Sequence, residues 1–200
     1  AQRDGLRRSW LRQRSTSGDF DYAFFVGSSS SVACSGERVG DLVCLLNISD
    51  AYTDLAIKVL GALSWAASTV DAPFILKADE NTWADMAAIV RYLRTYGSPW
   101  FYGGDLGDNL GGPVHREGKW AVPRELYNFS AYPVYPYGGG YVLSKQTALA
   151  VVNMVKRGRA PLLRNVEDAC VGIAAKLLSI EPTAIAGFYS SMTPRPVGGP

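Results

Sequence analysis

Residues Ile75–Trp83 read ILKADENTW, and this stretch takes an apolar run directly into charged and amide side chains. Its apolar part, with Phe74 before it, has the length and composition of a strand buried in the middle of a sheet. Ligands of open α/β sheets bind beyond the carboxyl ends of the strands. The polar residues that follow the strand, Asp79, Glu80 and Asn81, are therefore candidates for a binding site.

Two interpretations of these polar residues are open. Carboxylates at this position can coordinate a hard divalent cation, which in turn neutralises a diphosphate. Alternatively, Asp79 or Asn81 forms the N-cap of a helix over residues 82–96, because short polar side chains accept hydrogen bonds from the free N–H groups of a helix start. The two interpretations are compatible, since caps and ligand sites share helix starts.

The rest of the chain alternates strand-like runs with helical patterns, and this order predicts an α/β domain over residues 1–189. Further strands are expected at residues 22–26, 41–46, 100–102 and 141–143. Helices are expected at residues 55–66, with Asp50 or Thr53 as N-cap, at 86–93 and 148–155, and from Asn165 or Glu167 onward. The Pro/Gly-rich residues 190–200 are expected to form a tail.

Composition narrows the function classes. With 48% apolar and 19% charged residues the chain is an ordinary globular one, and its net charge of +2 gives no indication of nucleic-acid binding. No apolar run is long enough to span a membrane. The GxSxG, Walker, GxGxxG and HExxH motifs are absent, which argues against the common hydrolases, nucleotide hydrolases and metalloproteases.

Cysteines and arginines add two further observations. The three cysteines lack the spacing of a zinc site, and a Cys34–Cys44 disulfide is one open pairing. The arginines near the N-terminus form either a solvated basic face or a contact surface for phosphate, because Arg pairs with phosphate in bidentate fashion. These arginines are Arg3, Arg7, Arg8, Arg12 and Arg14.

Two other stretches are candidates for chemistry. Glu167 and Asp168 lie at an expected helix start, where acids either complement the helix dipole or supply a general base for an acceptor hydroxyl. Gly138, Gly139 and Gly140 lie among tyrosines and prolines. They are either a plain turn or a place where backbone approaches a ligand while aromatic rings stack on sugars or bases; the density of tyrosines favours the site.

Read in order, these pieces resemble motifs of the β-1,3-galactosyltransferase family, glycosyltransferase family 31, which includes β-1,3-N-acetylglucosaminyltransferases and the fringe proteins. The resemblance covers nearly the whole chain. The segments that carry it are Arg3–Trp10, Glu37 with Gly40–Leu42, Asp50–Leu55 with Lys58 and Trp65, Lys77–Asn81, Lys119–Trp120, Tyr132–Ser144 and Glu167–Gly172.

The resemblance implies a GT-A-type, Rossmann-like nucleotide-sugar transferase domain, with a mixed central sheet flanked by helices and its first strand missing from this chain. It also implies an inverting transfer of galactose or N-acetylglucosamine from a UDP-sugar to a hydroxyl, usually the 3-OH, of an acceptor glycan on a glycoprotein, glycolipid or phosphoglycan. The family's type II membrane proteins place the catalytic domain in the Golgi lumen, so an N-terminal anchor is expected outside this chain.

The resemblance also implies roles for individual residues. Asp168 would be the general base, and Asp79 with Asn81 would hold Mn²⁺. The residues expected to contact the UDP-sugar donor are Arg3, Arg7, Lys77, Asp79, Glu80, Gly139 and Gly140.

One departure from the family pattern matters for function. The family has an aspartate where this chain has Asn81, and a neutral amide lacks the charge that makes a carboxylate a tight cation ligand. Two alternatives to metal-dependent transfer therefore stay open. One is a catalytically degenerate glycan- or nucleotide-binding pseudoenzyme of the same fold, and the other is transfer in which Lys77 and the arginines replace the cation.

Overall fold

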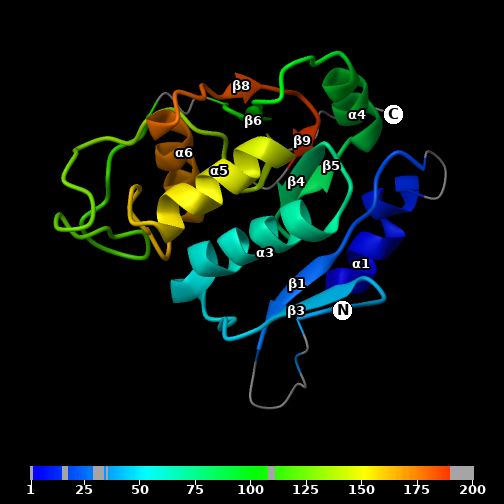
Figure 1. Cartoon of the computed structure of the whole chain (residues 1–200), viewed down its shortest axis with the longest axis horizontal. Coiled ribbons are helices and arrows are strands. Elements are labelled where there is room, and N and C mark those ends of the chain that lie inside the picture. The colour runs from blue at the N-terminus through cyan, green and yellow to red at the C-terminus, as the bar shows by residue number, and fades with distance from the viewer. Residues whose placement is uncertain (1, 15–17, 29–33, 35, 108–110, 190–200) are drawn as a thin grey trace.

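The structure is a computed structural model, and it describes residues 2–14, 18–28, 34, 36–107 and 111–189. The expected tail at residues 190–200 lies outside the described residues. In Figure 1 the helices lie in front of short strands, with the N-terminal helix at one side of the molecule. The alternation of strands and helices confirms the predicted α/β class.

The N-terminal part forms a small mixed sheet. Its strands are β1 (Phe24–Gly27), β2 (Arg38–Val39) and β3 (Leu42–Leu45), in the order β1-β3-β2. β3 pairs with β1 in parallel and with β2 antiparallel. The helix α1 (Gln2–Arg8) and the 3₁₀ helix η1 (Trp10–Gln13) precede it. The Cys34–Cys44 disulfide is formed and ties the segment before β2 to β3, as one of the open pairings predicted.

The second sheet organises the centre of the molecule. Its strands are β4 (Phe74–Ala78), β6 (Tyr102–Gly104), β7 (Gly140–Ser144) and β8 (Thr183–Ala184), in the order β4-β7-β6-β8. β7 is antiparallel to β4 and to β6, whereas β6 and β8 are parallel. All five residues of β7 are buried, while those of β4 are half-buried. The expected central position of β4 is therefore wrong: β7 occupies the interior, and β4 lies at the end of this strand order.

The helices pack on the second sheet, and the buried apolar residues of the molecule form two separate cores. The helices are α3 (Leu55–Thr69), preceded by the 3₁₀ turn η2 (Tyr52–Asp54), α4 (Met86–Arg94), α5 (Lys145–Lys156) and α6 (Glu167–Leu177). α3, α5 and α6 pack against one another and bury the larger core together with β7. α4 and η1 share a second core with Phe101 and Phe188, beside the two-stranded sheet of β5 (Trp83–Ala84) and β9 (Phe188–Tyr189).

Two expected helix caps are wrong. α4 begins at Met86, and its N-cap is Asp85, whose Oδ1 accepts a hydrogen bond from the Ala88 N–H at 3.0 Å. Residues Trp83–Ala84 pair with β9 instead of extending the helix, so neither Asp79 nor Asn81 caps it.

At α3, the helix follows η2, with Asp54 at its N-cap position. The Asp50 carboxylate instead accepts from the Gly27 N–H at 2.9 Å and from Lys58 Nζ at 2.5 Å. The expected caps, Asp50 and Thr53, are therefore not the N-cap. Asp50 is already occupied in joining the end of β1 to α3.

The described α-helices are 7 to 15 residues long. Within the described parts of the chain, none of them has both the length and the apolar composition that a membrane crossing requires. Ser144 is the N-cap of α5, and its side chain accepts a hydrogen bond from the Thr147 N–H. The apolar stripe of this helix is buried, as predicted, and consists of Ala148, Val151, Val152 and Val155.

Candidate functional site

The ends of β4 and β7 bring two of the predicted site segments together. The register pairs Lys77 with Tyr141 and Ala78 with Gly140, so the residues after β4 lie beside the residues before β7. The Asp79 N–H donates to the Gly139 carbonyl at 2.9 Å, and the Thr82 hydroxyl donates to the same carbonyl at 2.6 Å. The polar stretch of the opening motif is thus bound to the glycine run.

The start of α6 completes the cluster. The Gly138 N–H donates to Asp168 Oδ2 at 3.0 Å, and the Ala169 N–H donates to Asp168 Oδ1 at 2.9 Å. Three stretches far apart in the sequence therefore meet at one place: the loop after β4, the glycine run before β7, and the acidic helix start. The sequence singled out each of them, and the structure joins them.

Lys77 lies at the centre of the cluster. Its ammonium donates to Asp79 Oδ1 and to Glu167 Oε1, both at 2.6 Å, and to the Gly138 carbonyl. The Tyr141 hydroxyl donates to the other carboxylate oxygen of Glu167 at 2.8 Å. Both oxygens of Glu167 and all three N–H groups of the Lys77 ammonium are thereby engaged.

The pKa directions follow from this arrangement. The carboxylates of Glu167 and Asp79 hold the pKa of Lys77 above its ordinary value in spite of burial, which acts in the opposite direction, so the lysine keeps its proton. Burial raises the pKa of Glu167 and outweighs the attraction of Lys77, with Asp168 adding a second negative charge nearby. Burial also raises the pKa of Asp168, partly offset by the Ala169 N–H.

The structure separates the roles of the two neighbouring acids. The Glu167 side chain is 4% exposed and fully engaged with Lys77 and Tyr141. Asp168 is partly exposed and faces the glycine run, and burial raises the pKa of both acids. Partial exposure beside the glycine run, and not the direction of the pKa, therefore makes Asp168 the candidate for a general base, whereas Glu167 is buried.

Few side chains at the loop after β4 are available to bind a cation. Asp79 is partly exposed, and Glu80 and Asn81 are exposed at the same loop. Within the described ranges, no three His, Cys, Asp or Glu side chains gather as a metal-binding group. Mg²⁺-like cations in proteins often take only one or two carboxylates and complete their shell with substrate phosphates and water. The residues present fit a cation bound together with a diphosphate, and not one held by the protein alone.

The N-terminal segment contacts this loop through η1. The Trp10 indole N–H donates to the Thr82 carbonyl at 2.9 Å, and this bond is buried. Arg3 is exposed on α1, whereas Arg7 pairs with Asp41 at 2.7 Å and with Asp4 at 2.5 Å. Arg7 thus joins α1 to the small sheet, and donor contact by either arginine stays a prediction.

The glycine run is explained by close packing. A Cβ on Gly138 would lie 2.9 Å from Asp168 Oδ2, and one on Gly140 would lie 2.3 Å from the Phe188 ring. Neither Gly138 nor Gly140 has a positive φ, so the chain needs small residues at these two positions for space and not for a left-handed backbone. Gly138 and Gly139 do form a turn, in which the Gly140 N–H donates to the Tyr137 carbonyl at 3.2 Å. Approach of a ligand to this turn stays a prediction.

Sequence reasoning missed the tyrosines beneath the site. Tyr102 and Tyr141 are buried with their rings 6.0 Å apart, and the Tyr141 hydroxyl holds Glu167. The buried hydroxyls of Tyr102 and Tyr132 have no hydrogen-bond partner among the described residues. The only available signal was the density of tyrosines before β7, which indicated a site but not which rings reach the acids.

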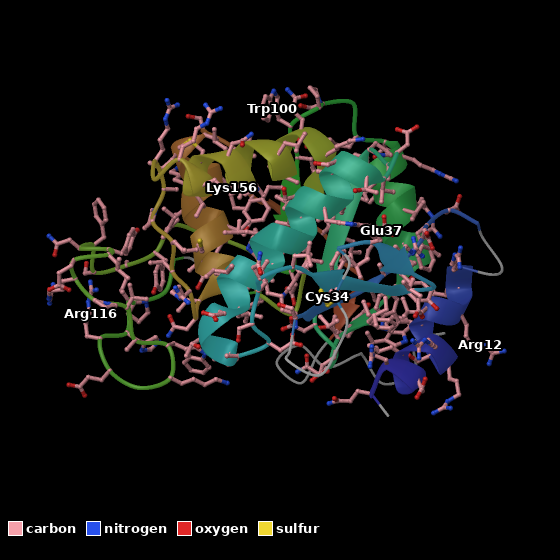
Figure 2. The ribbon with its side chains drawn as sticks, turned by 60° about the horizontal axis from the view of Figure 1, so that its bottom comes forward. Arg12, Cys34, Glu37, Trp100, Arg116 and Lys156 are labelled. Carbon is pink, nitrogen blue, oxygen red and sulfur yellow. A yellow bond between two sulfur atoms is a disulfide. The ribbon has the colours of Figure 1, made fainter. Side chains whose placement is uncertain are left out.

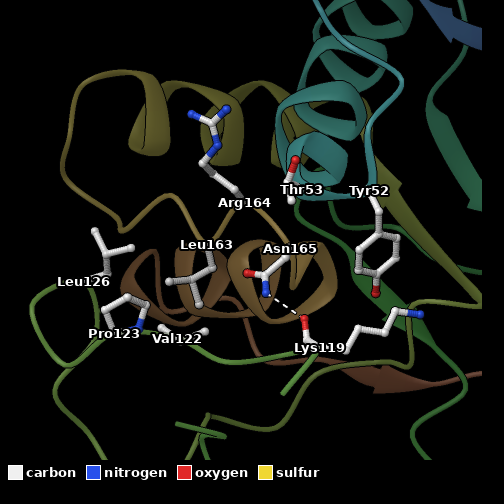
Figure 3. A pocket seen from close by; sticks show the side chains of 9 residues that line it. All are labelled: Tyr52, Thr53, Lys119, Val122, Pro123, Leu126, Leu163, Arg164 and Asn165. Atoms are coloured by element: carbon white, nitrogen blue, oxygen red, sulfur yellow. Dashed lines mark hydrogen bonds between the residues drawn. The ribbon is translucent and has the colours of Figure 1, made fainter. Parts of the chain in front are cut away.

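A pocket of about 260 Å³ lies elsewhere, at the N-terminal ends of α3 and α6 (Figure 3). Tyr52, Leu126 and Asn165 are among its lining residues, and Asn165 Nδ2 donates to the Lys119 carbonyl at 2.9 Å. Its lining contains none of the predicted donor, metal or base residues.

Figure 2 shows Arg116 in the neighbouring loop, at the opposite end of the molecule from Arg12. The Arg116 guanidinium donates hydrogen bonds to the carbonyls of Val122, Tyr127 and Phe129.

Comparison with known proteins gives a consistent result. The human acetylgalactosaminyl-O-glycosyl-glycoprotein β-1,3-N-acetylglucosaminyltransferase is 29% identical over 204 residues, covering 94% of this chain and 52% of that protein. Mouse β-1,3-galactosyltransferase 1 is 30% identical over 145 residues, covering 70% of this chain and 43% of that protein. The Arabidopsis thaliana hydroxyproline O-galactosyltransferase GALT2 is 29% identical over 182 residues, covering 86% of this chain and 26% of that protein.

The chain spans about half, or less, of the length of these relatives. The sequence model of the Galactosyltransferase family matches residues 1–186, nearly the whole chain. The resemblance drawn from the ordered motifs is thereby confirmed, and the chain belongs to the Galactosyltransferase family.

Proposed function

We propose that the protein is an inverting glycosyltransferase of GT-A type, which transfers galactose or N-acetylglucosamine from a UDP-sugar to the 3-OH of an acceptor glycan in β-1,3 linkage. The observation that carries the proposal is the meeting of Asp168 with the Asp79–Asn81 loop and the glycine run. Two of the relatives named above, a β-1,3-N-acetylglucosaminyltransferase and a β-1,3-galactosyltransferase, support the same reaction class.

Asp168 would act as the general base. As the acceptor hydroxyl oxygen bonds to the anomeric carbon, the bond from that carbon to the diphosphate oxygen breaks, and the hydroxyl proton passes to the Asp168 carboxylate. Attack from the side opposite the leaving group inverts the anomeric centre. The Gly138 N–H, which binds Asp168 Oδ2, orients the carboxylate for this transfer.

The loop after β4 would receive the donor. Asp79 and Asn81 would hold Mn²⁺ jointly with the donor diphosphate, and the ion would supply positive charge to the departing UDP. Glu80 lies in the same loop, Gly139 accepts a hydrogen bond from the Asp79 N–H, and Gly140 pairs with Ala78. Arg3 lies on α1, whose successor η1 contacts the loop through Trp10. The acceptor would be a glycan of a glycoprotein, glycolipid or phosphoglycan, and the Golgi lumen, with a membrane anchor in a preceding segment, would be the place of action.

Replacing the base tests the proposal. In purified full-length protein, Asp168→Asn is expected to abolish transfer from UDP-galactose and UDP-N-acetylglucosamine while binding of UDP, measured by calorimetry, is retained. The matched control is Glu181→Gln, which changes an exposed carboxylate, paired with Lys176, to an amide. Full transfer activity in Asp168→Asn would refute the assignment of the base.

Asn81 supports a second candidate, a glycan- or nucleotide-binding pseudoenzyme of the same fold. Of the two residues expected to hold the cation, Asn81 is a neutral amide, and one carboxylate oxygen of Asp79 already accepts a hydrogen bond from Lys77. Titrating UDP with and without Mn²⁺ separates the candidates. A transferase of the proposed kind binds UDP more tightly with Mn²⁺ and turns the donor over, whereas a pseudoenzyme shows neither effect.

A further inference from the structure

Lys77 and Glu167 form the most enclosed ion pair near the site, and the proposed reaction uses neither of them directly. Their side chains are 12% and 4% exposed, and Lys77 Nζ lies 2.6 Å from Glu167 Oε1. Burial of an ion pair at this depth is costly unless its partners are well satisfied. Here they are, because the Tyr141 hydroxyl and the Gly138 carbonyl complete the hydrogen bonds.

The pair connects the three segments of the site. Lys77 comes from the end of β4, Glu167 from the first turn of α6, and the Gly138 carbonyl from the glycine run. The N–H of the same Gly138 donates to the Asp168 carboxylate. One ammonium group therefore fixes, through direct bonds, the residue next to the base and the glycine that holds the base.

The same ammonium also fixes the donor loop. It donates to Asp79 Oδ1, and the Asp79 N–H donates to the Gly139 carbonyl, so both the side chain and the backbone of Asp79 are oriented. Because all three ammonium hydrogens are used, contact of Lys77 with a donor diphosphate would require breaking one of these bonds.

We propose that Lys77 and Glu167 are a positioning pair, which holds the base Asp168 at a fixed place relative to the donor loop Asp79–Asn81, and that Lys77 acts in this way instead of contacting the donor. The inference rests on the proposed transfer reaction. It deepens that reaction by assigning the residues that set the geometry between base and donor, on which the rate depends: a misplacement of about 1 Å can lower a rate by about 10²-fold.

The test compares Lys77→Met, Glu167→Gln and the double variant with the wild type. In purified full-length protein, each single variant is expected to lower kcat for transfer by about 10²-fold while the donor KM changes by less than about threefold. The double variant should lose no more than the worse single variant, since both changes break one connection. Lys176→Met and Glu181→Gln break an exposed pair of equal length, 2.6 Å, and should leave kcat unchanged.

Folded Lys77→Met and Glu167→Gln variants with kcat within about twofold of wild type would overturn the inference. So would an unchanged kcat with a strongly raised donor KM, because that result assigns Lys77 to donor contact. Glu167→Gln is nearly isosteric, so it keeps the test decisive where Lys77→Met fails to fold.

A second readout does not depend on activity. Hydrogen–deuterium exchange of the peptide containing Gly138–Tyr141 should speed up in Glu167→Gln relative to Glu181→Gln, because the glycine run loses its support. Unchanged exchange there would overturn the positioning role. A wild-type protein that transfers no sugar would refute the proposed function alone, and this exchange measurement would still decide whether the pair holds the loop.

Discussion

Gly138 offers a sharp test of how closely the base must be held, through the substitution Gly138→Ala. The added Cβ would lie 2.9 Å from Asp168 Oδ2, 3.3 Å from its carboxylate carbon and 3.3 Å from Glu167 Oε1. Glu167 cannot yield, because Lys77 and Tyr141 hold both of its oxygens. The Asp168 carboxylate must therefore move.

The size of the effect follows from these distances. To reach ordinary contact at 3.4 Å, Asp168 Oδ2 has to retreat by about 0.5 Å, which weakens its 3.0 Å bond from the Gly138 N–H. A displacement of this size at a catalytic group is expected to lower kcat by about tenfold to 10²-fold. The loss of stability should be small, about 1 kcal/mol, because only one partly exposed side chain is displaced.

The assay measures kcat with the preferred UDP-sugar and the melting temperature, which should fall by about 2–4 °C. Gly112→Ala is the matched control, since a Cβ there meets nothing within 4 Å and its φ is not positive. A Gly138→Ala protein with wild-type kcat would refute the reasoning, because a base that tolerates this displacement is not held by the glycine run. An equal loss of kcat in Gly112→Ala would refute it too.

Three further predictions concern single groups. Burial raises the pKa of Asp168, and only the ionised carboxylate can accept a proton. On acidification, kcat should therefore begin to fall at a pH above the ordinary aspartate pKa of about 3.9. A kcat that stays constant down to that pH would contradict this. Tyr102→Phe should be neutral or stabilising in thermal unfolding, since it removes a buried hydroxyl without a partner in the described chain; a loss above about 1 kcal/mol would show that the hydroxyl is bonded. Asp85→Ala removes the cap that accepts from the Ala88 N–H and should cost about 1 kcal/mol in denaturant unfolding, whereas Asp85→Asn should retain most of that stability; equal stabilities for both would argue against the cap.

Much of the local structure could be predicted from sequence periodicity. The stripe of α5 and the short strand after Pro73 follow from the spacing of apolar residues, because helices and strands must turn those side chains toward a core. α6 begins at Glu167, one of its two expected starts. The cap of α4 could not be predicted, since Trp83–Ala84 pairs with β9 from the far end of the chain. A local pattern carries no information about a partner strand more than a hundred residues away.

The sequence by itself determined which residues form the candidate site: the acids and amide after β4, the glycines before β7 and the pair Glu167–Asp168. Only the tertiary structure decided where each of the two acids lies and what it contacts. Adjacent residues on a helix point in different directions, so one turns into the interior, where Lys77 and Tyr141 satisfy it, and the other remains partly open beside Gly138. The difference between a buried anchor and a candidate base is a matter of direction and burial, which the order of residues along the chain does not contain.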